Sequence, residues 1–200
     1  EKPGEPSWES PWGMGRPGWH IECTAIAQEF LGSSIQIQGG GSDLIFPHHE
    51  MGSAQAECIS GKEFARAYVH TGMIGLDGEK MSKSRGNLVF VSDLRRKHDP
   101  NAIRLALLMG HYRSNRDWSN DLLSQAENKL SFWRITLAHS LGTDSTSTIE
   151  KIVESLSNDL DTPAAIAHID DWMNEQKGSG DVSGPGKITR AIDALLGLAL

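Results

Sequence analysis

Cysteine is scarce in this sequence, because the 200 residues include only Cys23 and Cys58. Two cysteines are too few for the disulfide framework that stabilises many small secreted domains, and no signal peptide is visible. We therefore expect a reducing, cytoplasmic location.

Long apolar runs are also missing. The longest mainly apolar stretches, such as residues 103–109, which include Arg104, are far shorter than the roughly 20 residues that a membrane span needs. Hydrophobic residues nevertheless make up 38% of the chain and charged residues 22%, which is the balance of a globular protein and not of a disordered tail. Two hundred residues are enough to bury one sizeable core or two small ones.

Positive charge is the third shortage, since 19 Lys and Arg residues face 26 Asp and Glu residues and the net charge is −7. A protein that coats nucleic acid usually shows a broad basic surface, so this class is disfavoured. A local basic site for a phosphate-bearing small molecule is still compatible with the composition.

The sequence begins with Glu1 instead of Met, and its first 18 residues contain four of the eight prolines and four glycines. This composition predicts a loop over residues 1–18. We also expect the chain to be a fragment, so that a site built from its residues is incomplete.

Periodicity and turn residues predict helices mixed with strands up to about residue 110, and helices alone after it. The predicted helices of the first part are 19–31, 48–57, a short helix capped by Ser92, and 103–109 after Asp99-Pro100; the predicted strands are 34–38, 68–70 and 73–76. The later helices are expected at 119–141, 148–159, 162–175 and 185–198, with a flexible connector over 177–186. We therefore expect an α/β domain over residues 1–115 and a small helical domain over 116–200.

The sharpest chemical signal is the run Lys80-Met81-Ser82-Lys83-Ser84, followed by Arg85-Gly86-Asn87. Two ammonium groups three residues apart on a loop can close over a polyphosphate and neutralise the charge that builds as pyrophosphate leaves. Two lysines alone would more often belong to a solvated turn.

Three consecutive glycines, Gly39 to Gly41, precede Ser42 and Asp43 at the end of a predicted strand. Glycines let the backbone approach a ligand closely, and nucleotides bind at the carboxyl ends of strands in open α/β sheets. A plain flexible turn is the alternative. Asp43 is expected to accept hydrogen bonds from ribose hydroxyls or a substrate ammonium, or else to cap a helix.

Cys23 and His48 are candidate zinc ligands, with His49 and Glu50 beside His48. A zinc site needs four groups, however, and only two or three candidates are visible. Cys23 alone is more often a small core residue, and the histidine pair also suits a helix cap or a buried hydrogen bond. Cys58 has no neighbouring partner and is predicted to lie in the core.

Residues 80–84 match all five letters of the KMSKS signature of class I aminoacyl-tRNA synthetases. Four segments in this order resemble cysteinyl-tRNA synthetase over about residues 8–120: GRPGWHIEC at 15–23, GGGSDL at 39–44, FPHHE at 46–50 and KMSKS at 80–84. A closer resemblance is to the cysteine:glucosaminyl-inositol ligases of mycothiol biosynthesis, which are paralogues of that synthetase. The segments MIGLDGE at 73–79, GHYR at 110–113, DLDTP at 159–163 and AIDALLG at 191–197 extend this likeness through Leu200.

The resemblance implies a Rossmann-like catalytic domain, of which residues 1–115 are the C-terminal part, followed by the helical domain. It also implies that ATP and L-cysteine form cysteinyl-adenylate and pyrophosphate, and that the amine of glucosaminyl-inositol then takes the cysteine. The partners are then small molecules, with Mg²⁺ beside ATP, no membrane, no nucleic acid and a monomeric protein.

Residue roles follow from the same resemblance. Cys23 and His48 match ligands of one zinc ion per chain, which binds the substrate thiolate and rejects serine. Lys80 and Lys83 match the catalytic lysines, and Lys83 matches the one that meets the ATP phosphates. The positions that match adenylate contacts are Trp19, Gly41, Ser42, Asp43 and Ile74.

Two departures from the synthetase pattern bear on the choice of acceptor and on activity. Gly52 stands where synthetases commonly place a glutamate four residues after the His ligand, which favours the ligase. The first zinc cysteine and the His-rich ATP motif of the family lie in an N-terminal half outside this sequence, so we expect the 200-residue chain alone to be inactive. Cysteinyl-tRNA synthetase is the alternative enzyme, and a non-catalytic nucleotide- or metal-binding relative is the alternative of another class.

Overall fold

The computed structural model describes residues 2–138, 143–176 and 184–200. The chain forms two compact units, Glu1–Gly72 and Met73–Leu200, which we call unit 1 and unit 2. The sequence-based domain boundary after residue 115 falls inside unit 2 and stays a prediction.

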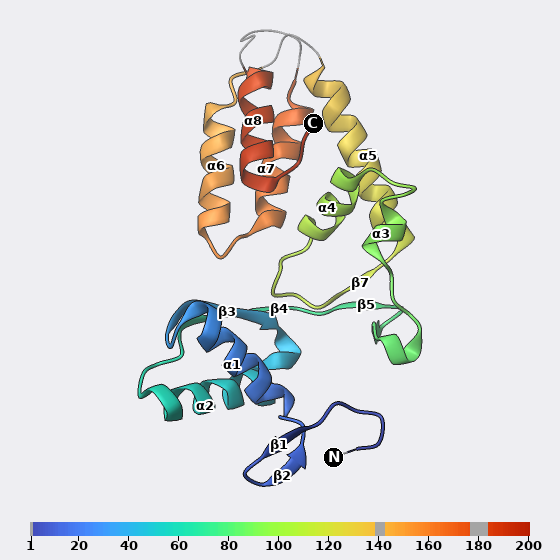
Figure 1. Ribbon diagram of the computed structural model, residues 1–200. Coiled ribbons are helices and arrows are strands. Elements are labelled where there is room, and N and C mark those ends of the chain that lie inside the picture. The colour runs from blue at the N-terminus through green and yellow to red at the C-terminus, as the bar shows by residue number, and fades with distance from the viewer. Residues whose placement is uncertain (1, 139–142, 177–183) are drawn as a thin grey trace. The chain divides into compact units, whose positions relative to one another are not determined.

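Unit 1 is built on a parallel pair of strands, β3 (Ile35–Gly41) and β4 (Ala65–Thr71), joined through helix α2 (Glu50–Ser60). Helix α1 (Trp19–Leu31) precedes β3 and packs beside α2, as Figure 1 shows. Two short irregular turns, η1 (Ser42–Leu44) and η2 (Ile45–His49), lead from the carboxyl end of β3 into α2. This strand–helix–strand unit has a small buried core made of Ile35, Ala56, Phe64 and Ala65, with Ala27 against it.

The first 18 residues are not all loop, because they contain the antiparallel hairpin of β1 (Trp8–Ser10) and β2 (Gly13–Gly15). The Ser10 hydroxyl donates to the Gly13 carbonyl at 2.6 Å and accepts from the Trp12 amide at 3.2 Å, which closes the turn. Gly13 adopts a φ of 105°, a region that glycine enters without steric cost. The expectation of a loop over this whole segment was therefore wrong.

Unit 2 begins with a three-stranded sheet in which β5 (Ile74–Leu76) lies between β6 (Glu79–Lys80) and β7 (Arg116–Trp118). β6 is antiparallel to β5 and β7 is parallel to it. The turn η3 (Lys83–Arg85) and the helices α3 (Val91–Leu94) and α4 (Pro100–Leu108) connect β6 to β7.

The helices after β7 are α5 (Asn120–Leu137), α6 (Thr146–Ser157), α7 (Thr162–Asn174) and α8 (Gly184–Leu196). α6 packs beside α7 and α8 in Figure 1, and one core of buried side chains joins these helices to α4 and α5. Trp133 is fully buried in this core, and its indole Nε1 donates to Asp170 at 2.9 Å, so burial leaves its polar atom satisfied.

Most of the predicted elements are confirmed with small changes of their ends, but the expectation of helices alone after about residue 110 was wrong, because β7 is a strand that pairs with β5. Asp99 caps α4 by accepting from the Asn101 amide, but α3 begins at Val91 with Phe90 as its cap, so the expected Ser92 cap was wrong. The end of the helix predicted to residue 141 and most of the predicted connector, 177–183, lie outside the described residues. Among the residues that are described, no helix combines the length and apolar character needed to cross a membrane.

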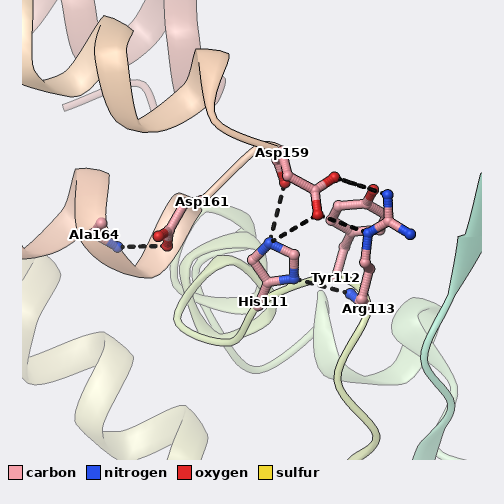
Figure 2. Close-up of polar contacts among 6 residues, drawn as sticks. All are labelled: His111, Tyr112, Arg113, Asp159, Asp161 and Ala164. Carbon is pink, nitrogen blue, oxygen red and sulfur yellow. Dashed lines mark hydrogen bonds and ion pairs between the residues drawn. The ribbon is translucent and has the colours of Figure 1, made fainter.

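Asp159 joins two segments that are far apart in the sequence, the turn between α6 and α7 and the loop between α4 and β7 (Figure 2). Its carboxylate accepts two hydrogen bonds from Arg113, at 2.7 and 3.0 Å, and one from the Tyr112 hydroxyl at 2.7 Å. The Asp159 carbonyl lies 3.0 Å from Nε2 of His111. Asp159 and Leu160 have φ values of 56° and 55°, so this turn holds two non-glycine residues in the left-handed region.

We predict that Asp159→Asn lowers the thermal unfolding midpoint at pH 7. Asparagine tolerates the left-handed backbone, so the variant removes the charge and leaves the turn possible. The hydrogen bonds from Arg113 and Tyr112 hold the pKa of Asp159 below its usual range. This stabilisation is therefore complete above the unfolded pKa of about 4 and is lost as the pH falls through the lower folded value.

The measurement is thermal unfolding of both proteins at several pH values, with Asp171→Asn on the exposed face of α7 as the matched control. We expect the difference between Asp159→Asn and its parent to shrink as the pH falls below about 4. Equal midpoints at pH 7 would show that the Asp159 contacts contribute nothing to stability.

Candidate functional site

The glycine run lies at the carboxyl end of β3 and belongs to the strand itself. The parallel register pairs Gly39 with Val69, Gly40 with His70 and Gly41 with Thr71. A flexible turn at this position is therefore excluded. The chain leaves the sheet at η1, which carries Ser42 and the exposed Asp43. Asp43 lies inside this turn, whose cap is Gly41, so the cap interpretation of Asp43 was wrong.

Gly40 leaves room for the buried ring of His49. A Cβ atom at Gly40 would lie 2.8 Å from Cε1 and 3.1 Å from Nε2 of His49, closer than real side chains approach. His49 is 6% exposed, and its ring is bonded on both sides. Nδ1 lies 2.8 Å from Nε2 of His70, and Nε2 lies 3.3 Å from Nε2 of Gln38. The space that a side chain at Gly40 would fill is therefore occupied by the His49 ring of the protein itself, and not by a ligand.

His48 is the second buried imidazole, and α1 supplies its neighbours. Its Nδ1 lies 2.8 Å from Nδ1 of His20, and its ring stacks on Trp19 with the ring centres 4.2 Å apart. Burial is the main cause that lowers the pKa of His48, and the nearby His20 lowers it further. Burial likewise lowers the pKa of His49, with smaller effects from His70 and His48. Both rings are therefore neutral at pH 7, and in each histidine pair one nitrogen donates while the other accepts.

A small pocket of about 30 Å³ brings Cys23 of α1 and His48 together. Its lining also includes His20, His49, Thr24 and Gly52. Gly52 is close-packed, because a Cβ atom there would lie 3.2 Å from Oγ1 of Thr24. Gly52, at the position where synthetases carry a glutamate, therefore forms part of the pocket wall and contributes no carboxylate.

The chemistry of the pocket fits two of the four ligands of a zinc ion. A neutral imidazole oriented through one ring nitrogen, beside a thiol, is the usual arrangement of nitrogen and sulfur ligands. The pocket volume suits a single ion or water molecule. Within the described residues, however, no three Cys, His, Asp or Glu side chains are close enough together to hold a metal. Cys23 and His48 could therefore supply only part of the ligand set that a zinc ion needs.

Residues 80–87, which we call the lysine-bearing loop, belong to unit 2. Lys80 is the last residue of β6 and pairs with Gly75 of β5, the residue that follows Ile74. Lys83 is the first residue of η3. Both lysines are exposed. An ion pair between Glu79 and Arg85 spans the segment that contains them.

The predicted site residues therefore fall into two groups. Unit 1 carries the first group, Trp19, Cys23, Gly41, Ser42, Asp43 and His48, and unit 2 carries Ile74, Lys80 and Lys83. Trp19, Cys23 and His48 are brought to one small region by α1 and the turn η2.

Sequence reasoning missed the pairing of His20 with His48 and of His70 with His49. His20 stands three residues before Cys23, which places both on one face of a helix and was a usable signal. His70 lies opposite Gly40 only because of the register between β3 and β4, and this register cannot be read from the sequence. One expectation was wrong, because Cys58 is exposed instead of buried. Of the two alternatives for the histidine pair, the buried hydrogen bond is confirmed, whereas neither side chain caps α2.

Comparison with known proteins finds similarity to class I synthetases and to ligases. The family profile described as tRNA synthetases class I (C) catalytic domain matches residues 1–128. Proteins named L-cysteine:1D-myo-inositol 2-amino-2-deoxy-alpha-D-glucopyranoside ligase are 55% identical in Thermobispora bispora and Rhodococcus erythropolis and 54% identical in Streptomyces griseus. These alignments cover 100% of this chain and 49%, 49% and 50% of the relatives, so the chain spans about half the length of the curated relatives it matches.

A solved structure supports the fold. The chain is similar to the LeuRS of Agrobacterium radiobacter K84 agnB2, solved as a ternary LeuRS–tRNA–LeuAMS complex, with a TM-score of 0.67 and 16% identity. The match covers 96% of this chain and 32% of that chain. At this identity the likeness is one of fold, and it confirms the predicted α/β class I architecture.

The contact between Gly40 and His49 leads to a stability prediction. We expect Gly40→Ala to lower the free energy of unfolding by about 1–3 kcal/mol, because the new methyl group must displace a ring held by two hydrogen-bonding neighbours. Gly39→Ala is the matched control, since its methyl group would meet only the Val69 carbonyl at 3.9 Å. Urea unfolding of the two variants measures the difference. Equal losses of stability would show that the space at Gly40 is not needed by His49.

Proposed function

The chain belongs to the family of class I (C) tRNA synthetase catalytic domains, and from this premise we propose that it forms part of an ATP-dependent cysteine ligase. In the proposed reaction, the carboxylate of L-cysteine attacks the α-phosphorus of ATP and pyrophosphate leaves. The amine of an aminosugar joined to inositol then attacks the carbonyl carbon of cysteinyl-adenylate, an amide forms and AMP leaves. The observation that carries this proposal is the 55% identity, over the full chain, to relatives named as ligases of cysteine and this aminosugar.

The proposed zinc ligands of this chain are Cys23 and His48. Their place in one small pocket and the neutral state of His48 support this assignment. A zinc ion there would bind the thiolate of cysteine and discriminate against serine, because a hydroxyl is a much poorer ligand. Gly52 leaves this wall of the pocket without a carboxylate, so the substrate thiolate can complete the ligand set together with a residue from the part of the relatives outside this chain.

The proposed adenylate contacts of unit 1 lie at the carboxyl end of β3 and on α1. Gly41 and Ser42 offer backbone amides and a hydroxyl where the chain leaves β3, and Asp43 offers an exposed carboxylate for ribose hydroxyls or the substrate ammonium. Trp19 is 57% exposed although it stacks on His48, so one face of its ring is open to a ligand. Ile74, at the start of β5 in unit 2, is proposed as an adenylate contact on the resemblance alone.

Lys80 and Lys83 are proposed to act on the triphosphate. Their ammonium groups are exposed and can neutralise charge on the β- and γ-phosphates as pyrophosphate departs, with Lys83 meeting the phosphates directly. Mg²⁺ is proposed to accompany ATP, as it does at most phosphoryl sites. The proposed protein is a cytoplasmic monomer that uses small-molecule substrates.

The identity of the acceptor is the first test. We predict that the enzyme at the full length of its curated relatives, given ATP and radiolabelled cysteine, transfers label to the glucosaminyl-inositol amine and not to tRNA. Transfer to tRNA in place of the aminosugar would contradict the proposal and would favour cysteinyl-tRNA synthetase. The 200-residue chain alone is predicted to show no cysteine-dependent pyrophosphate exchange, since it spans half of those relatives.

The two cysteines provide a matched test of the zinc assignment. Cys23→Ala should remove zinc from the full-length enzyme and slow cysteine-dependent pyrophosphate exchange by about 100-fold or more, because a ligand is lost. Cys58→Ala, on the exposed surface of α2, should change neither. Metal analysis and exchange rates measure both effects. Normal zinc content and activity in Cys23→Ala would contradict the assignment of this ligand.

A further inference from the structure

Asn87 closes the lysine-bearing loop at its base. The carboxamide Oδ1 of Asn87 accepts from the Ser82 amide at 2.9 Å, and its Nδ2 donates to the Lys80 carbonyl at 3.3 Å. One side chain thus binds the main chain on both sides of Met81. The ring of atoms that results encloses residues 80–87, which include both proposed catalytic lysines.

This double contact needs a side chain that both donates and accepts. An amide group carries one acceptor oxygen and two donor hydrogens, whereas a carboxylate only accepts. Aspartate could keep the bond from the Ser82 amide, but its second oxygen would face the Lys80 carbonyl and repel it. Alanine would lose both bonds and add no charge.

Apolar and backbone contacts hold the rest of the loop base. The side chains of Met81 and Val89 pack against the main core of unit 2, so both ends of the loop are tied to the same apolar surface. Gly86 has a φ of 66°, and its amide donates to the Lys83 carbonyl at 3.2 Å, which turns the chain back toward Asn87. The backbone at Lys80 and Ser82 is thereby fixed, while the side chains of both lysines extend from an exposed segment.

We propose that Asn87 is a positioning residue that sets the separation and direction of Lys80 and Lys83 for the departure of pyrophosphate. The inference rests on the proposed function of these lysines. Two cations stabilise a developing charge only when they are placed before it forms, and small errors in their placement reduce the rate greatly. Asn87 itself touches neither substrate nor reacting atoms in this role, since both of its bonds are made to the loop backbone.

The test uses Asn87→Asp and Asn87→Ala in the enzyme at the full length of its curated relatives. Asn128→Asp is the matched control, because it makes the same chemical change at an exposed position of α5. Cysteine-dependent pyrophosphate exchange gives kcat and the KM for cysteine. Trypsin, which cleaves after Lys80, Lys83 and Arg85, reports how far the loop opens.

We expect both Asn87 variants to lower kcat for exchange by about tenfold or more, with the KM for cysteine unchanged, since the lysines act on the triphosphate. Tryptic cleavage within residues 80–85 should become faster, whereas the thermal unfolding midpoint stays at that of the parent. Asn128→Asp should match the parent in all three measurements. If Asn87→Asp fails to fold, Asn87→Ala is judged by the same criteria.

Exchange within twofold of the parent, or cleavage of the loop at the parental rate, would overturn the positioning role. A parent enzyme without any cysteine-dependent exchange contradicts the proposed function instead. The cleavage comparison then still decides whether Asn87 holds the loop, because it does not depend on turnover.

Discussion

The buried ring of His49 under the bare Cα of Gly40 is the contact on which the candidate site of unit 1 depends. The ring can lie there only because β3 and β4 are parallel and in a register that sets His70 opposite Gly40. His49 then bonds to His70, and the adjacent His48 bonds to His20 and stacks on Trp19. Since burial keeps both rings neutral, hydrogen bonds can orient them without a buried charge, and Cys23 shares a pocket with an imidazole suited to a metal.

In unit 2, the proposed cationic groups are exposed, in contrast to the buried histidines of unit 1. The lysine-bearing loop places its charged side chains in solvent and fixes only its backbone, through the packing of Met81 and the carboxamide of Asn87. Asp117 contributes at the preceding turn, where its carboxylate accepts from the Gly78 amide at 2.6 Å. Both lysines are exposed, whereas His48 and His49 are buried. The pocket of unit 1 thus orients neutral side chains by burial and hydrogen bonds, whereas the lysine-bearing loop fixes its main chain and leaves its lysines exposed.

The sequence predicted the helices well because their apolar spacing and caps are local, as at α1 and at Asp99 before α4. It also singled out Cys23 and His48 by residue type, and the structure places both in one pocket, while their role as zinc ligands stays a prediction. The histidine partners depended on strand register and helix packing, which bring together residues such as His20 and His48, 28 positions apart. Cys58 was misjudged because the face that a helix buries depends on its neighbours and not on one residue's polarity. The hairpin of residues 8–15 was hidden by prolines and glycines that also favour tight turns.

The tail after α8 returns to the first long helix of unit 2. The Ala199 amide donates to the side chain of Asn101, 98 positions earlier, the Leu196 carbonyl accepts from Arg104 at 2.5 Å, and Leu198 is completely buried. During synthesis from the N-terminus, α5, which packs against α4, follows it closely, whereas the residues that make these further contacts follow about a hundred positions later. The part of the α4 surface that they cover therefore stays open to chaperones and to other nascent chains until they are made. The core of unit 2 is thus completed well after α4 itself, so the unit should gain protection from proteases late in its synthesis.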